Sequence, residues 1–225
     1  MGWAQRAAQS MVPAPDEALR QSQDVLSWSI RKNGPQSPIS IKAMAEVANQ
    51  LAHLDRLGEE LQMRENIVDA LRKERGPEDE STLSAEWKLA TCLSILDRPG
   101  EAEPLLAHVV ECRTRDLGRS DPQTLAALAW SASVAKKLGR LSDARSFQEQ
   151  VVAGYGEQGA GESDLALLAE LHLASILTDL HDLPGASRLL RHVLHVRQRV
   201  LGADDPKTLD VLRFLDSIGA DGEAG

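Results

Sequence analysis

The sequence predicts an all-α fold, a right-handed α-solenoid built from antiparallel helix pairs. The first observation is an internal repeat: steps of forty-two residues align, without gaps, GPQSPISI, GPEDESTL, GRSDPQTL, AGESDLAL and GADDPKTL. The second is that each copy carries apolar residues three and four positions apart over two segments, the spacing of amphipathic helices. The third is a turn signal between those segments. A helix, turn, helix unit repeated at a fixed period predicts a stacked array.

Each repeat begins with a residue that favours the start of a helix. Side-chain oxygens at the N-cap accept hydrogen bonds from the first free backbone amides, and proline at the next position loses none. Proline follows in three of the five copies, at Pro38, Pro122 and Pro206. We therefore expect first helices to begin after Ser37, Asp79, Asp121, Ser163 and Asp205.

Within a repeat, small residues mark where the two helices approach each other. The middle of the first helix holds alanine in every full copy, at Ala48, Ala90, Ala132 and Ala174. Leucine closes that helix at Leu54, Leu96, Leu138 and Leu180. A break is then expected at Leu57-Gly58, Pro99-Gly100, Gly139-Arg140 and Pro184-Gly185. The second helix follows, with alanine near its start at Ala102, Ala144 and Ala186.

This register divides the chain into one solenoid domain with incomplete ends. Residues 1–33 are expected to form a partial N-terminal repeat. In it, the segment from Trp3 to Val12 is long enough only for the end of a first helix. Full repeats occupy 34–75, 76–117, 118–159 and 160–201. A capping helix is expected over 202–219, and a polar tail over 220–225.

These positions resemble the tetratricopeptide repeat, and the period with its G-x-x-D/S-P-x-T-L opening is similar to the kinesin light chain variety. The resemblance covers roughly Pro15 to Ile218. It implies a protein-interaction module in which the first helices line a concave groove. The chain differs from the family at a usual Asn pair in the first helix, where it has Ala45 and Glu46, Trp87 and Lys88, Ala129 and Trp130, Leu171 and His172.

The expected groove is mostly polar, with one tryptophan and a lysine pair. An aromatic anchor beside cations suits an extended peptide with acidic side chains or a free carboxylate. Packing of Trp87 against the neighbouring repeat is the alternative role for that residue. The candidate peptide-binding residues are Lys42, Asn49, His53, Trp87, Thr91, Ser133, Lys136, Lys137, Ser175, Asp179 and Arg213.

Composition limits the function classes. A formal net charge of −9 argues against general affinity for nucleic acid or anionic membranes, both of which need cationic surfaces. Cys92 and Cys112 lack metal-type spacing and are expected to be reduced and buried. The sequence shows neither an apolar run of membrane-spanning length nor a signal peptide, so we expect a cytoplasmic protein.

Three further patterns in the sequence resemble ligand sites. Gly154, Gly156 and Gly159 spell G-x-G-x-x-G but follow a helix, which favours a glycine-rich helix end over a dinucleotide site. Histidines cluster in the fourth repeat without completing a metal shell, so neither a metal nor a cofactor is expected. A basic stripe on an expected outer helix could be solvated surface or a phosphate or acidic-partner patch. Its members are Arg188, Arg191, His192, His195 and Arg199.

The sequence thus favours a scaffold or adaptor that binds a protein or peptide, with acidic ligands among the candidates. The alternative is the C-terminal ligand-sensing region of a larger signalling ATPase, as the resemblance also implies. An enzyme that uses the histidines of the fourth repeat is a third hypothesis, but no catalytic signature supports it. The sequence leaves the partner and the oligomeric state open.

Overall fold

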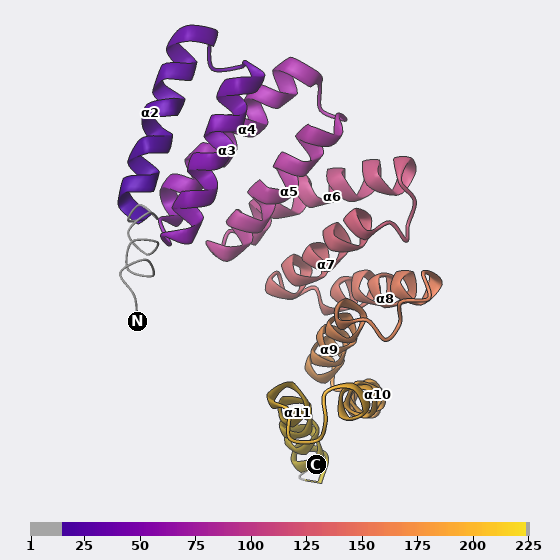
Figure 1. The fold of residues 1–225 in the computed structure, drawn as a ribbon. Coiled ribbons are helices and arrows are strands. Elements are labelled where there is room, and N and C mark those ends of the chain that lie inside the picture. The colour runs from indigo at the N-terminus through magenta and orange to yellow at the C-terminus, as the bar shows by residue number, and fades with distance from the viewer. Residues whose placement is uncertain (1–14, 224–225) are drawn as a thin grey trace, which may run out of the picture. The chain divides into compact units, whose positions relative to one another are not determined.

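The computed structural model describes residues 15–223, and over that range the chain is helical with no strand. Figure 1 shows the helices in chain order. They are α2 (Pro15–Asn33), α3 (Pro38–His53), α4 (Leu57–Arg75), α5 (Glu80–Ile95), α6 (Pro99–Asp116), α7 (Pro122–Lys137), α8 (Leu141–Glu157), α9 (Asp164–Asp179), α10 (Leu183–Val200) and α11 (Pro206–Glu223). This is an α-solenoid, the predicted fold class.

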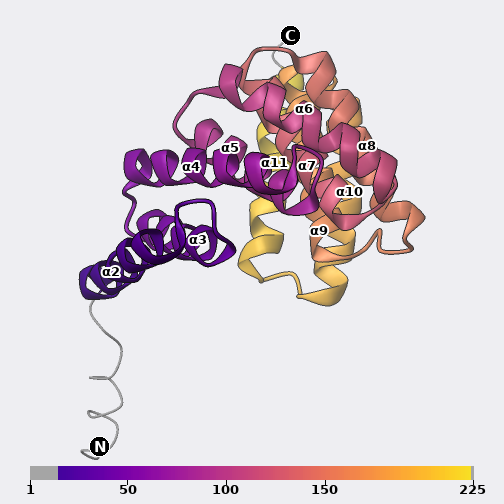
Figure 2. The same cartoon turned by 90° about the horizontal axis from the view of Figure 1, so that it is seen from above.

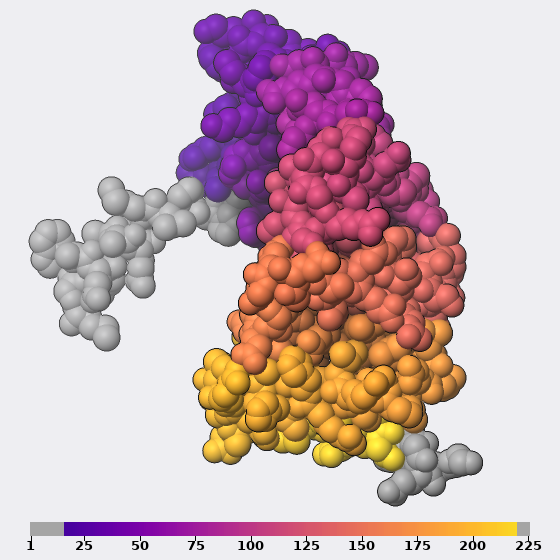
Figure 3. Space-filling view, turned by 90° about the vertical axis from the view of Figure 1, so that its right-hand side faces the viewer, coloured from indigo at the N-terminus to yellow at the C-terminus, as the bar shows by residue number. Residues whose placement is uncertain are grey.

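The chain divides into two compact units, Met1–Leu105 and Leu106–Gly225, with the boundary inside α6. In unit 1, α3 packs against α2 and α4, and α4 packs against α5 (Figure 2). In unit 2, α8 packs against α7 and α9, and α10 packs against α9 and α11. Figure 3 shows consecutive stretches of unit 2 as successive layers, from pink through orange to yellow. Within each unit, these helices therefore pack on their neighbours in sequence, as in a repeat array.

The predicted capping residues stand where expected. Each has its side-chain oxygen within hydrogen-bond distance of a backbone amide in the first turn, as a helix start requires. Ser37 accepts from the Ser40 amide at 3.2 Å, and Asp121 accepts from Gln123 at 2.8 Å. The same contact is made by Asp79, Ser163 and Asp205. The prediction of these helix starts is confirmed.

Three of the four turns between paired helices lie earlier than predicted, whereas Gly139-Arg140 lies in the turn between α7 and α8, as predicted. The first helices do end at the predicted leucines, but the next residue is already in the left-handed region, with φ of 57° at Asp55, 59° at Asp97 and 60° at His181. The Pro-Gly and Leu-Gly pairs that were read as breaks lie instead in the first turn of α4, α6 and α10. Proline is favoured there because that amide needs no partner.

The alanines mark close helix contacts. Ala48, Ala90 and Ala174 are fully buried, and Ala132 is 1% exposed. The second helices contribute Ala102, Ala144 and Ala186, which are also fully buried. In unit 2, Ala174 and Ala186 belong to one apolar cluster that continues through Leu190, Val193 and Ile218. Small side chains at these points let the paired helices approach closely.

The glycine motif is structural. A Cβ atom on Gly154 would lie 2.4 Å from Cδ2 of Leu125, which is itself fully buried, so α8 can approach α7 there only without a side chain. Gly159 has φ of +67°, a conformation that ends the helix and suits glycine. No strand precedes the motif anywhere in residues 15–223, so the dinucleotide-site context is absent.

Other expectations are met in part. Both cysteines are buried and neither forms a disulfide. Burial, with the nearby Glu60 carboxylate adding to it, raises the pKa of the Cys92 thiol to about 11. Helix α11 continues to Glu223, past its expected end at 219. The proposed helical tail from Trp3 to Val12 lies outside the described residues. Within residues 15–223, no helix is both long and apolar enough to cross a membrane.

Candidate binding grooves

Each unit contains a groove of the same construction. Its walls are the first helix of one repeat and the first helix of the next, and its floor comes from the second helix between them. Groove 1 lies in unit 1 between α3, α4 and α5, with a volume of about 300 Å³. Groove 2 lies in unit 2 between α7, α8 and α9, with a volume of about 480 Å³. The fold therefore offers two comparable sites, one in each unit.

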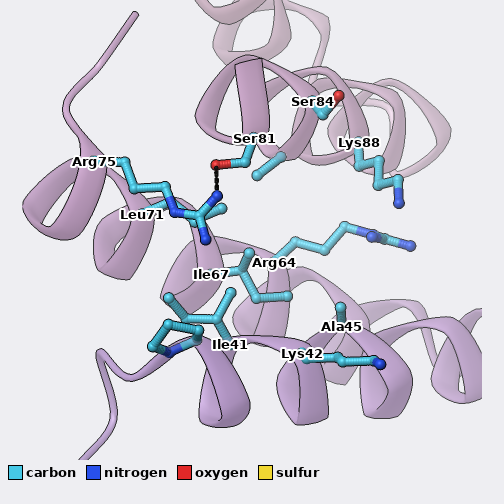
Figure 4. Close-up of a pocket in the computed structure, with 12 residues that line it drawn as sticks. Ile41, Lys42, Ala45, Arg64, Ile67, Leu71, Arg75, Ser81, Ser84 and Lys88 are labelled. Carbon is cyan, nitrogen blue, oxygen red and sulfur yellow. Dashed lines mark hydrogen bonds between the residues drawn. The ribbon is translucent and has the colours of Figure 1, made fainter. Parts of the chain in front are cut away.

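Groove 1 combines an apolar floor with a cationic mouth. Ile67 and Leu71 on α4 form the floor, and Ile41 lines the α3 wall. Lys42, Arg64 and Lys88 come from three different helices. Figure 4 shows the ends of these three basic side chains on one side of the pocket. No acidic residue lines the groove. In a protein of net charge −9, this is a local concentration of positive charge.

The cations of groove 1 differ in how they are held. Arg64 pairs with Glu60 at 2.6 Å, and both side chains are largely buried. Arg75 donates to Ser81 Oγ at 3.2 Å at the other end of the pocket (Figure 4). Lys42 and Lys88 are exposed and make no ion pair within residues 15–223. Their ammonium groups are accessible to an anionic ligand.

Groove 2 is mainly apolar. Leu125, Val151 and Tyr155 line it together with Trp130. On the α9 wall, Leu165 is 60% exposed and Leu168 is 44% exposed. Exposed leucines beside aromatic side chains in a concave site are the type of surface that buries an apolar partner residue.

Polar contacts close one end of groove 2. The Lys136 ammonium group lies 2.7 Å from Asp179 Oδ2 and donates to Ser175 Oγ at 2.8 Å, which links α7 to α9. At the floor, the buried Gln148 amide donates to the Ala169 carbonyl oxygen at 3.0 Å. The Lys136 contacts join the two walls, and the Gln148 contact joins the floor to the α9 wall.

His172 also lines groove 2. Although the residue is exposed overall, surrounding atoms exclude part of the water around its ring. This partial desolvation, together with the charge of Lys136, lowers the pKa of His172. The imidazole is therefore neutral at neutral pH and can donate or accept a hydrogen bond.

The lowered pKa of His172 predicts a pH dependence. The His172 ring binds a proton less readily in the folded state than in the unfolded state. Its contribution to the free energy of unfolding is therefore fully present above the unfolded pKa of about 6.5. That contribution is lost as the pH falls through the lower pKa of the folded state. An NMR titration of the His172 ring should give a midpoint below about 6.5. Lys136→Met should raise that midpoint, because it removes the second cause. A wild-type midpoint at or above the unfolded value would contradict the prediction.

The structure places the predicted groove residues in several environments. Lys42 lines groove 1, and Ser133, Lys136 and Ser175 line groove 2. Asp179 reaches groove 2 only through its contact with Lys136. The remaining predicted residues line neither of these two grooves: Asn49, His53, Trp87, Thr91, Lys137 and Arg213.

Trp87 and Arg213 have other surroundings. Trp87 is partly buried, and its indole nitrogen is buried without a hydrogen-bond partner among the described residues. Arg213 pairs with Asp210 on the surface of α11.

Several groove residues were missed because they come from the second helices. Arg64 and Tyr155 lie on α4 and α8, which were expected to face outward. Lys88 and Trp130 were noticed only as departures from the usual Asn pair. The signal that could have identified the α9 wall was the leucine pair at positions 165 and 168, three apart just after the helix start, where the two preceding copies are polar or small.

The basic stripe on α10 is partly paired. His192 Nδ1 lies 2.7 Å from Oε2 of the largely buried Glu170, and Arg199 pairs with Glu162. Arg188, Arg191 and His195 are exposed. No group of three or more His, Cys, Asp and Glu side chains within the described range could hold a metal ion.

Comparison with known proteins agrees with the fold. Residues 171–207 match a family model described as tetratricopeptide repeat. The crystal structure of a variant of Podosopora anserina repeats, described as kinesin light chain TPR-like, superposes with a TM-score of 0.76 and 22% identity, covering 83% of this chain and 88% of that chain. The crystal structure of BtubC (BKLC) from P. vanneervenii superposes with a TM-score of 0.74 and 12% identity, covering 92% of this chain and 83% of that chain. MamA from Desulfovibrio magneticus RS-1 superposes with a TM-score of 0.55 and 12% identity, covering 83% of this chain and 99% of that chain.

Stacked helix pairs with interhelical grooves define the chain as an α-helical repeat protein. Residues 171–207 resemble the tetratricopeptide repeat, and the structural neighbours share the fold of such repeats. At these identities, the structural likeness shows the fold alone. No curated protein sequence matches the chain.

Proposed function

We propose that this protein is an interaction scaffold that holds a segment of a partner protein in its interhelical grooves. The tetratricopeptide fold supports protein binding in general, and it is typical of scaffolds rather than enzymes. The observation that carries the proposal is groove 2, with two exposed leucines and two aromatic side chains in one concave site. The partner segment for this groove carries at least one large apolar side chain, which displaces water from Leu168 and Trp130.

The two grooves favour different ligand chemistry. An acidic segment suits groove 1, where Lys42 and Lys88 lack ion pairs among the described residues. The lysine pair first considered for this role is less suitable, because Lys136 already contacts Asp179. We therefore assign acidic ligands to groove 1 and apolar anchors to groove 2, and keep the cytoplasm as the predicted location.

Peptide display tests the proposal without knowledge of the natural partner. A random peptide library is selected on the wild-type chain, and the enriched peptides are measured by isothermal titration calorimetry. Peptides with apolar anchors should lose at least about tenfold in affinity for Leu168→Glu, because a buried carboxylate would face the anchor. Val200→Glu is the matched control, since Val200 is 66% exposed but does not line the groove.

The outcomes separate the possibilities. Acidic peptides should depend on Lys42 and Lys88, and should be insensitive to Lys137→Glu. Undiminished binding of every enriched peptide to both Leu168→Glu and Lys42→Glu would place the site elsewhere, with the α10 stripe next to test. The alternative role, a ligand-sensing region of a larger signalling ATPase, would use the same grooves and predicts a nucleotide-binding segment in the full-length gene.

A further inference from the structure

The outer face of α2 exposes large apolar side chains. α2 lies at the edge of unit 1, with α3 packed on one side of it (Figures 1 and 2). On its other side, Val25 is 56% exposed and Trp28 is 50% exposed. The Lys32 ammonium group lies 4.8 Å from the centre of the Trp28 ring, so Lys32 shares this face.

The repeat register shows what this face lacks. By the forty-two-residue period, α2 is a second helix, and the equivalents of Val25 are buried in all other copies: Ile67 6%, Val109 0%, Val151 2% and Val193 0% exposed. The equivalents of Trp28 are buried as well: Ala70, Cys112, Gly154 and Val196. In the complete pairs α3 with α4, α7 with α8 and α9 with α10, the first helix packs on the second. Within residues 15–223, α2 has no such first helix.

We propose that α2 of a second copy of this chain occupies that position, in an antiparallel, two-fold symmetric dimer. Charge supports this choice of partner. The first turn of α2 is acidic, with Asp16 and Glu17, and its last turn is basic, with Arg31 and Lys32. Antiparallel pairing of two such helices places the acidic turn of each copy beside the basic turn of the other.

The residues that matter share one face. At about 100° per residue, Glu17 lies about 20° from Trp28 around the helix axis, and Lys32 lies about 40° from it. The apolar pair therefore lies between Glu17 on its N-terminal side and Lys32 on its C-terminal side. The contact is isologous, so it closes at two copies. Gln21 and Asp24 are exposed on the same face, so we expect a weak dimer in a concentration-dependent equilibrium with the monomer.

Sedimentation velocity of the full chain over a wide concentration range tests the proposal. The wild type should change from monomer to dimer as the concentration rises. Val25→Glu should weaken the dimer at least about tenfold, because two carboxylates would enter the contact. Ile95→Glu is the matched control: Ile95 is 58% exposed in the same unit, and this variant should dimerise like the wild type.

Charge reversal tests the antiparallel arrangement. Glu17→Lys alone and Lys32→Glu alone should each dimerise poorly, because like charges would face each other. An equimolar mixture of these two variants should form a heterodimer more readily than either forms a homodimer, since both contacts then pair opposite charges. Added salt should reduce the difference in stability between this heterodimer and the two homodimers, because it screens the charges.

Three outcomes would overturn the proposal. A wild type that remains monomeric at every concentration would mean that no second copy covers the face. A dimer that survives Val25→Glu would place the interface elsewhere. Species that keep growing with concentration, with no preference for the charge-reversed mixture, would indicate a head-to-tail contact.

Discussion

Replacing Ala174 with leucine should destabilise the protein by about 1 to 3 kcal/mol. Ala174 is fully buried in the apolar cluster of unit 2, beside Ala186 and Leu190. A larger side chain must separate α9 from α10 or adopt a strained rotamer. Leucine is a good helix former and more hydrophobic than alanine, so helix propensity alone forecasts almost no change. The substitution therefore separates close packing from propensity.

Urea unfolding measures the effect, and Ala153→Leu is its control. Ala153 is an exposed residue of α8, where leucine should change the free energy of unfolding by no more than about 0.5 kcal/mol. Ala132 is a less clean choice than Ala174 because it also borders groove 2, where a leucine could find room. If Ala174→Leu were as stable as the wild type, the central alanine would not be a contact point.

The fold could be predicted from the sequence because the same residue types recur at equivalent positions of each repeat. Each first helix received a capping residue, a central alanine and a closing leucine, and in the complete repeats every one of these is found where the pattern placed it. Three of the four turns were misplaced because Pro-Gly and Leu-Gly pairs were interpreted as breaks. In those turns the left-handed residue is Asp55, Asp97 or His181, whereas Gly139 marked the turn of the third repeat correctly.

The grooves were harder to predict than the fold. A groove wall depends on which face of a helix turns inward, and the period fixes that face only approximately. Ser133, Lys136, Ser175 and Asp179 were all predicted groove residues, but the contact between Lys136 and Asp179 was not predicted, because it forms only through tertiary packing. Arg64 was missed because its long side chain reaches groove 1 from a second helix.

Replacing Arg72 should lower the free energy of unfolding more than replacing an arginine whose ion pair is exposed on both sides. Arg72 on α4 donates from Nε and Nη2 to Oε1 of Glu86 on α5, at 2.9 and 2.7 Å. The Glu86 side chain is completely buried, whereas Arg72 is 43% exposed. Arg72→Met leaves a buried carboxylate without this donor, and such a group retains its desolvation cost. We expect a loss of about 2 to 3 kcal/mol, because Glu86 keeps other contacts.

The comparison pair is Arg145 with Glu149, whose side chains are 46% and 47% exposed. Arg145→Met should cost at most about 0.5 kcal/mol, since water solvates both charges when the pair is broken. The double variant Arg72→Met with Glu86→Met should be more stable than the sum of the two single losses predicts, because no buried charge remains. Urea unfolding of the four proteins gives the coupling energy, and hydrogen exchange should locate the damage at α4 and α5. Equal losses for Arg72→Met and Arg145→Met would mean that burial of Glu86 adds nothing to the pair, and that the contact between these two repeats rests on apolar packing alone.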